Sequence, residues 1–238
     1  LIRPRRKSPR ICRTESSRSS MLLPGAPVMI KRAIDATVSL LGLLILAPFL
    51  LYVALRIKMG DGGPVFYRGE RTGLYGKPFR IFKFRTMVVD ADRIGGASTA
   101  EDDARITSVG KFLRKYKLDE LPQLINVLRG EMSIVGPRPE VKHYTDMFSD
   151  EEKAILSVLP GITDWASIWN ADEGVILAGA EDPERAYLEL VRPMKLKLQL
   201  KYVRERSFWV DLKIIVLTLL AIVEPDSQAV REIRGGKQ

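Results

Sequence analysis

The chain has 238 residues, of which 46% are hydrophobic and 28% are charged, and its formal net charge is +9. This length suits one ordinary domain with a membrane segment, and the composition excludes a wholly disordered chain and one buried entirely in a membrane. A single cysteine, Cys12, and a single histidine, His143, exclude an internal disulfide, a thiolate metal site and a multi-histidine metal site. Any chemistry therefore runs on carboxylates and cations, and the cysteine count suits the reducing cytoplasm.

Residues 1–20 are rich in arginine and serine, and Glu15 is their only acidic residue. We expect a basic disordered tail here, with Met21 as an alternative natural start. A mitochondrial-type targeting segment is the rival interpretation, but the stretch lacks the amphipathic apolar face of such a segment.

Residues 21–58 are predicted to form a membrane helix, because the apolar run from Ala33 to Ile57 is long enough to span a bilayer. Pro48 lies in its middle and would kink the helix. Basic residues, which mark the cytoplasmic side of a membrane, flank both ends of the run: Lys31 and Arg32, then Arg56 and Lys58. A straight spanning helix and a helix that bends at Pro48 and returns to the same face both fit these residues.

A cytosolic domain is expected over residues 59–225. Short strands are predicted at Val65–Tyr67 and Phe79–Arg85, around a glycine-marked turn. In the second strand Lys83 and Arg85 would share a face, which also fits an ordinary solvated strand face.

The central part of this domain is predicted to be helical. Helices are expected at Ser108–Tyr116 and Glu120–Leu128, with Gly130 as a stop signal, and again over 140–160. Residues Gly161–Trp169 are expected to form a loop.

The last helices are expected at Pro183–Glu205, which is long and basic, and at Phe208–Val223, which is apolar. The latter is short for a membrane span and suits an interfacial or core helix. Residues 226–238 are predicted to be a loose C-terminal tail.

The adjacent carboxylates Asp119 and Glu120 are the main candidates for chemistry. Acidic residues at a helix start are common for structural reasons alone, because they complement the helix dipole. Here, however, arginines surround the pair, including Arg114 and Arg138, and arginine binds phosphate oxygens through paired hydrogen bonds. A carboxylate in such a setting can act as a nucleophile or hold Mg²⁺, whereas a set of surface ion pairs is the structural alternative.

The segment KLDELPQLINVLRGEMSIVGPRPE, residues 117–140, resembles the signature of the monotopic phosphoglycosyl transferases, which are the bacterial sugar transferase family of polyprenyl-phosphate sugar-1-phosphate transferases. Further matching motifs are KRAID (31–35), FKFRTM (82–87), PGIT followed by a tryptophan (160–165) and YVRERSFWVDLKI (202–214). Together they cover nearly everything from Lys31 to Val223.

The resemblance implies an enzyme in which Asp119 attacks the sugar-bearing phosphate of a UDP-sugar. UMP leaves, and undecaprenyl phosphate then takes the phosphosugar, which initiates a bacterial surface glycan. Glu120, with Asp119, would hold Mg²⁺. The resemblance assigns phosphate binding to Arg114, Arg138, Lys83 and Arg85, and the helix kink to Ala47 and Pro48.

The fold that the resemblance implies is α+β and mostly helical. It has a re-entrant, proline-kinked membrane helix hairpin, a short β-hairpin and amphipathic interfacial helices around a cytosolic catalytic domain. This favours the bent form of the helix at Pro48. The protein is expected at the bacterial inner membrane, facing the cytoplasm, with UDP-sugar, polyprenyl phosphate and the lipid bilayer as partners.

The sequence departs from the family pattern where PGITDWASIWNAD carries Asp164, Ser167 and Trp169, and in an insertion-like segment, Glu173–Asp182. Two other classes of function compete with this interpretation. A non-catalytic lipid-binding module would explain the basic faces but not the carboxylates among them. Nucleic-acid binding is not expected, because residues 1–20 contain no aromatic residue.

Overall fold

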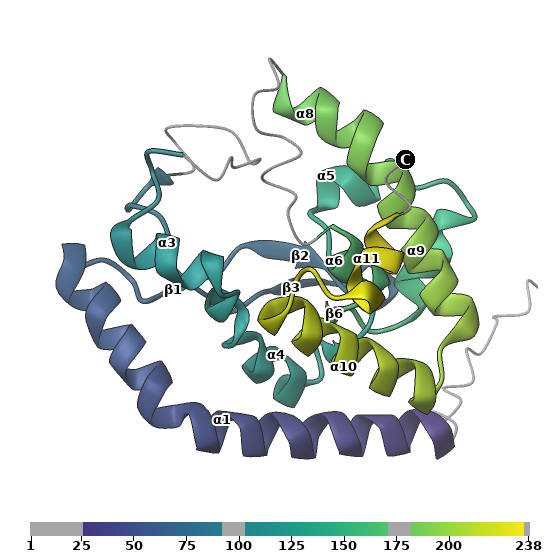
Figure 1. Cartoon of the computed structure of the whole chain (residues 1–238), viewed down its shortest axis with the longest axis horizontal. Coiled ribbons are helices and arrows are strands. Elements are labelled where there is room, and N and C mark those ends of the chain that lie inside the picture. Colours follow the sequence, from purple (N-terminus) through teal and green to yellow (C-terminus); the bar gives the residue numbers. More distant parts are fainter. Residues whose placement is uncertain (1–25, 92–102, 171–181, 236–238) are drawn as a thin grey trace, which may run out of the picture.

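A computed structural model describes residues 26–91, 103–170 and 182–235. The predicted basic tail and most of the insertion-like segment lie outside these ranges. Figure 1 shows one long helix, α1, beneath a domain of shorter helices and strands. The described ranges contain three two-stranded sheets, so the protein is mostly helical with short strands, as the sequence predicts.

Helix α1 runs from Ala26 to Asp61 and bends, as its two differently directed parts in Figure 1 show. Pro48 lies inside it and removes a backbone hydrogen bond, which gives the bend a physical cause. Within the described ranges, only the stretch Val28–Asp61 is long and apolar enough to cross a membrane by length and composition. Only 11% of its most apolar window is buried in the protein, which distinguishes it from the core helix of a soluble domain.

The N-terminal half of α1 is held to the domain by polar contacts. Arg32 donates to the carbonyl of Leu128 at 2.8 Å, at the C-terminal end of α4 (Gln123–Arg129). A cation suits this position because helix carbonyls end there without intrahelical partners. Asp35, which is 5% exposed, accepts a hydrogen bond of 2.7 Å from Ser133 Oγ.

The C-terminal half of α1 packs on the domain through apolar side chains. Val53 and Ile57 form a buried cluster with Phe84 and Leu113. Leu113 belongs to α3 (Ser108–Lys115), which confirms the predicted helix over 108–116. Both halves of α1 therefore contact the same domain.

The predicted antiparallel arms are present, but each is divided into two short strands, and Glu70–Thr72 lies beyond the range predicted for the first strand. β2 (Glu70–Thr72) pairs antiparallel with β3 (Pro78–Arg80) across the 3-10 turn η1 (Leu74–Gly76). β4 (Lys83–Phe84) instead pairs antiparallel with β1 (Phe66–Tyr67).

Strands β5 (Ser133–Val135) and β6 (Gly161–Thr163) form a parallel pair. A Cβ at Gly161 would lie 2.1 Å from the amide nitrogen of Gly136, so this close approach needs glycine. The loop prediction for Gly161–Trp169 is therefore wrong, because β6 is followed at once by α6 (Trp165–Trp169).

The helix predicted over 140–160 is present only as short pieces, α5 (Lys142–Thr145) and the 3-10 helix η3 (Glu152–Ser157). The long basic helix is present as consecutive segments, with a π-helical stretch near its N-terminal end: α8 (Pro183–Ala186), η4 (Tyr187–Val191) and α9 (Arg192–Glu205).

Helix α10 spans Phe208–Val223, the range that the sequence predicts. The C-terminal residues differ from the expected loose tail, because α11 (Gln228–Arg234) is helical and its Val230 is fully buried. Figure 1 shows α10 lying above α1. An ion pair of 2.6 Å between Lys31 and Asp211 joins the two helices.

Candidate active site

The adjacent carboxylates lie in a short 3-10 helix, η2 (Leu118–Glu120), between α3 and α4. Lys117, which precedes it, has a left-handed backbone with φ of 55°. Helix α3 ends at Lys115, and the left-handed Lys117 turns the chain into η2. Asp119 is 4% exposed and the Glu120 side chain 14%, which distinguishes both from ordinary solvated helix-start residues.

Lys83 of β4 joins the two carboxylates. Its Nζ lies 3.0 Å from Oδ2 of Asp119 and 3.1 Å from Oε1 of Glu120. The strand pairing of β4 with β1 places Lys83 there, although 36 or more residues separate it from the carboxylates along the chain. The structure thus brings together three of the residues that the sequence singled out.

Arg138 contacts the same cluster from the other side. Its Nη1 donates to Oε2 of Glu120 at 3.0 Å, and its Nη2 donates to Oε1 of the same carboxylate. This paired geometry is the strong form of an arginine–carboxylate contact. Pro137 and Pro139, on either side, restrict the backbone that carries this guanidinium.

The charges of the cluster stabilise one another. Burial acts to raise the pKa of Glu120, but Arg138 and Lys83 outweigh it and hold that pKa well below its usual range. Burial likewise acts to lower the pKa of Lys83, but Glu120 and Asp119 outweigh it, so the net shift is upward. Near neutral pH, Glu120 is therefore an anion and Lys83 a cation.

Arg114 lies at the edge of the cluster, on α3. Its Nε donates to Oγ1 of Thr86 at 2.9 Å, and it interacts electrostatically with Asp119. Burial lowers the pKa of this guanidinium, while Asp119 opposes the shift. Thr86 is a supporting residue that sequence reasoning did not identify, since only the fold brings it to Arg114.

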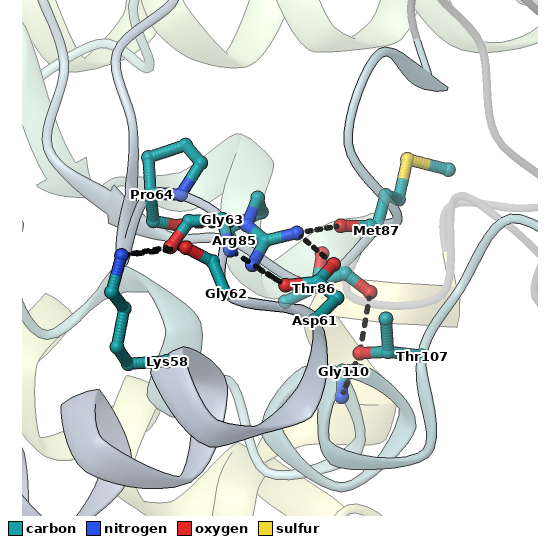
Figure 2. Close-up of polar contacts among 10 residues, drawn as sticks. All are labelled: Lys58, Asp61, Gly62, Gly63, Pro64, Arg85, Thr86, Met87, Thr107 and Gly110. Carbon is teal, nitrogen blue, oxygen red and sulfur yellow. Dashed lines mark hydrogen bonds and ion pairs between the residues drawn. The ribbon is translucent and has the colours of Figure 1, made fainter.

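Arg85, the fourth predicted phosphate-binding cation, has a different setting (Figure 2). Its guanidinium makes two hydrogen bonds of 2.5 Å to the carboxylate of Asp61, and its Nε donates to the carbonyl of Pro64 at 2.6 Å. It is 8% exposed. The structure therefore uses Arg85 to attach the end of α1 to the strand region that carries Lys83, apart from the carboxylate pair.

The space around Asp61 and Arg85 is closely filled. A Cβ at Gly63 would lie 2.9 Å from Nη2 of Arg85, and one at Gly110 would lie 2.0 Å from the carbonyl oxygen of Thr86. Figure 2 shows Thr107 and Gly110 beside Thr86, where α3 begins. The glycines let the helix ends approach the segment between Lys83 and Met87.

Within the described ranges, no group of three or more acidic, histidine or cysteine side chains is arranged to hold a metal ion. Asp119 and Glu120 supply two carboxylates. Mg²⁺ commonly uses one or two carboxylates and completes its shell with water and substrate phosphates. The donor set fits a metal that is shared with a phosphate-bearing substrate, and it does not fit an all-protein cage.

A sequence model of the family described as "Bacterial sugar transferase" matches residues 26–225. The chain is 39% identical over 203 residues to the UDP-glucose:undecaprenyl-phosphate glucose-1-phosphate transferase of Escherichia coli (strain K12), covering 83% of this chain and 41% of that protein. It is 37% identical to the protein of the same name from Caulobacter vibrioides, over 87% of this chain and 76% of that one.

A third relative, from Aeromonas hydrophila, is 32% identical over 88% of this chain and 47% of its own length, and it is named for transfer of N-acetylgalactosamine phosphate from its UDP form. The chain spans only about two fifths of the length of several curated relatives that it matches, the Escherichia coli protein among them. The match includes α1, the carboxylate pair and every cation around it. This chain belongs to the bacterial sugar transferase family.

Proposed function

We propose that the protein transfers a sugar-1-phosphate from a UDP-sugar to undecaprenyl phosphate and releases UMP. The observation that carries this proposal is the pair of buried Asp119 and half-buried Glu120 held by Lys83, in a domain attached to an exposed apolar helix. The relatives' names, which specify a UDP-sugar and undecaprenyl phosphate, support the same substrates here. Such a reaction would initiate a bacterial surface glycan.

The nucleophile in this proposal is Asp119. Its carboxylate oxygen bonds to the phosphorus that carries the sugar, and the bond from that phosphorus to the bridging oxygen breaks, so that UMP leaves. A phosphate oxygen of undecaprenyl phosphate then attacks the same phosphorus and releases the Asp119 carboxylate. A covalent intermediate divides one displacement into two, so the two anionic substrates do not have to react directly with each other.

The division of roles follows from the contacts. Both oxygens of Glu120 accept from cations, whereas Asp119 has Lys83 as its one ion-pair partner in the described part of the chain. Asp119 is thus the less engaged carboxylate and the better nucleophile. In this proposal Lys83 and Arg114 offset charge on the phosphoryl group, and Arg138 keeps Glu120 ionised.

Mg²⁺ would be held by Asp119 and Glu120 together with substrate phosphates. Each carboxylate oxygen has two lone pairs, so Glu120 can contact a metal while it accepts from Arg138. The ion would supply charge neutralisation of the diphosphate.

We also propose that α1 enters the membrane and returns to the cytoplasmic face, with α10 at the interface. Arg32 near one end and Asp61 at the other both bind the same domain, and a hydrocarbon core about 30 Å thick would separate the ends of a spanning helix. Phe208 and Trp209, which are 57% and 74% exposed, suit the headgroup level at the start of α10. The domain would face the cytoplasm at the inner membrane.

The test is UMP release in nanodiscs that contain undecaprenyl phosphate, with Mg²⁺ and a panel of UDP-sugars, for the parent and for Asp119→Asn. We expect release with at least one donor and its loss in the folded variant. With a donor labelled in its sugar, the label should be found on the peptide that contains Asp119 after an acid quench. Turnover by Asp119→Asn near the parent rate would refute the nucleophile assignment, and no release by the folded parent with any donor would refute the reaction.

A further inference from the structure

Two side chains outside the carboxylate cluster hold the backbone of Arg138. Oδ2 of Asp164 accepts a hydrogen bond of 3.2 Å from the Arg138 amide, and Nε2 of Gln199 donates to the Arg138 carbonyl at 3.3 Å. Asp164 and Gln199 are both 0% exposed. A fully buried carboxylate and a fully buried amide are costly to place unless they have a specific partner.

The two prolines leave Asp164 only one backbone donor to bind in this segment. Pro137 and Pro139 have no N–H, so the Arg138 amide is the only backbone donor in this tripeptide. The residue before the tripeptide is fixed as well, since the Gly136 amide donates to the carbonyl of Thr163 at 3.0 Å. The backbone that carries Arg138 is therefore held by β6, by the residue that follows β6 and by α9.

The other carboxylate oxygen of Asp164 accepts two further hydrogen bonds. Oδ1 accepts from the amide of Ser167 at 2.6 Å and from its hydroxyl at 2.7 Å, which caps the start of α6. One carboxylate thus joins α6 to the Arg138 backbone. Asparagine has one acceptor oxygen in place of two, so it can serve the cap or the Arg138 amide but not both.

We propose that Asp164 and Gln199 are positioning residues that set the Arg138 guanidinium against Glu120 and so fix the charge geometry of the site. The proposal rests on the proposed phosphosugar transfer. Neither residue has a hydrogen bond to Asp119 or Glu120 in the described part of the chain, and both act through the Arg138 backbone. Small displacements of a cation that sets the charge of a carboxylate in the site are costly, because the cation is effective only when it is oriented in advance.

The first test is the kcat/KM for UMP release by Asp164→Asn, with Ser167→Ala as the matched control, because the latter weakens only the cap. We expect a loss of about ten- to a hundredfold for Asp164→Asn, the usual cost of a supporting contact, and less than about a threefold change for Ser167→Ala. Gln199→Met, which does not touch the cap, should act in the same direction and keeps the proposal testable if Asp164→Asn does not fold.

A double-mutant cycle separates positioning from general stability. In an Arg138→Met background, Asp164→Asn should change kcat/KM by less than about twofold, because its route to the site is gone. If Asp164→Asn lowers kcat/KM by the same factor in both backgrounds, the residue does not act through Arg138 and the proposal fails.

A readout without turnover keeps this proposal distinct from the proposed function. In ¹⁵N-arginine spectra of the full chain in nanodiscs, the Arg138 guanidinium signal is the one missing from Arg138→Met. We expect Asp164→Asn to shift or broaden that signal and Ser167→Ala to leave it in place. A changed signal with no UMP release by the parent would refute the reaction but support the positioning role, and an unchanged signal would overturn the positioning role.

Discussion

The ion pair between Asp61 and Arg85 ties the end of α1 to the segment that carries Lys83, so its removal should loosen that attachment (Figure 2). We consider Asp61→Asn, Arg85→Met and the double variant. Asp61→Asn keeps the shape of the side chain but leaves the guanidinium of Arg85, which is 8% exposed, without its anion. The double variant removes both charges, so a double-mutant cycle over the four proteins isolates the coupling energy of the Asp61–Arg85 ion pair.

The structure gives the size of the effect. Hydrogen bonds from Arg85 and then from the Gly63 amide lower the pKa of Asp61 from 3.8 to about 2. At about 1.4 kcal/mol for each pKa unit, this corresponds to roughly 2.5 kcal/mol. Part of this energy belongs to the Gly63 amide, and the Asp61 side chain is 35% exposed, so the expected coupling energy between Asp61 and Arg85 falls to about 1–1.5 kcal/mol.

The assay is urea unfolding of the four proteins in the same detergent. The control is the pair of Lys142 and Asp146, whose side chains are 74% and 61% exposed and whose coupling should be close to zero. If the change in unfolding free energy of the double variant equals the sum of the two single changes within about 0.3 kcal/mol, the ion pair has no coupling energy and the reasoning is refuted.

The same pair predicts a pH dependence. Since the folded-state pKa of Asp61 is lowered, its contribution is complete above the unfolded value of 3.8 and is lost as the pH falls toward 2. The stability difference between the parent and Asp61→Asn should therefore be level from about pH 7 to 5 and decrease below about pH 4. A difference that already declines between pH 7 and 5 would assign the effect to another group.

Three further predictions concern the cluster and the helix. Lys83→Met should lower kcat/KM for UMP release by about a hundredfold or more, because Asp119 and Glu120 then lack their shared cation; a loss below about threefold would contradict its role. Glu120→Gln should destabilise the fold by about 1–3 kcal/mol near neutral pH. Because the pKa of Glu120 lies well below 4.5, this difference in urea unfolding should persist at pH 5 and shrink only below 4.5, whereas a loss between pH 7 and 5 would contradict the assignment. Pro48→Ala should straighten α1 toward a spanning form. Single cysteines that replace Met29 and Met59, with Cys12 changed to serine, should label from one side of the membrane when Pro48 is present and from opposite sides in the variant. Labelling from one side in both proteins would refute this role for the proline.

Several structural predictions failed for a common reason, which is that tertiary contacts overrode local patterns. The range Gly161–Trp169 has the glycine and polar residues of a loop, yet Gly161 starts a strand because β5 lies beside it and leaves no room for a side chain. Asp164 then begins a helix by capping, and an aspartate directly before a helical run is a start signal that the sequence contains. The residues beyond Val223 include a helix because Val230 finds a buried site in the fold.

Sequence by itself determined the features that depend on near neighbours or on composition. These are the apolar run with Pro48, the bounds of α10, the helix at Ser108–Lys115 and the adjacency of Asp119 and Glu120. Each follows from helical periodicity, capping or chain order, which need no knowledge of distant residues.

Only the tertiary structure decided which cation serves which carboxylate. Lys83 and Arg85 are two residues apart on one strand region, yet the first meets Asp119 and the second meets Asp61. The physical reason is that an ion pair depends on separation in space, and the pairing of β4 with β1 and the path of α1 set that separation.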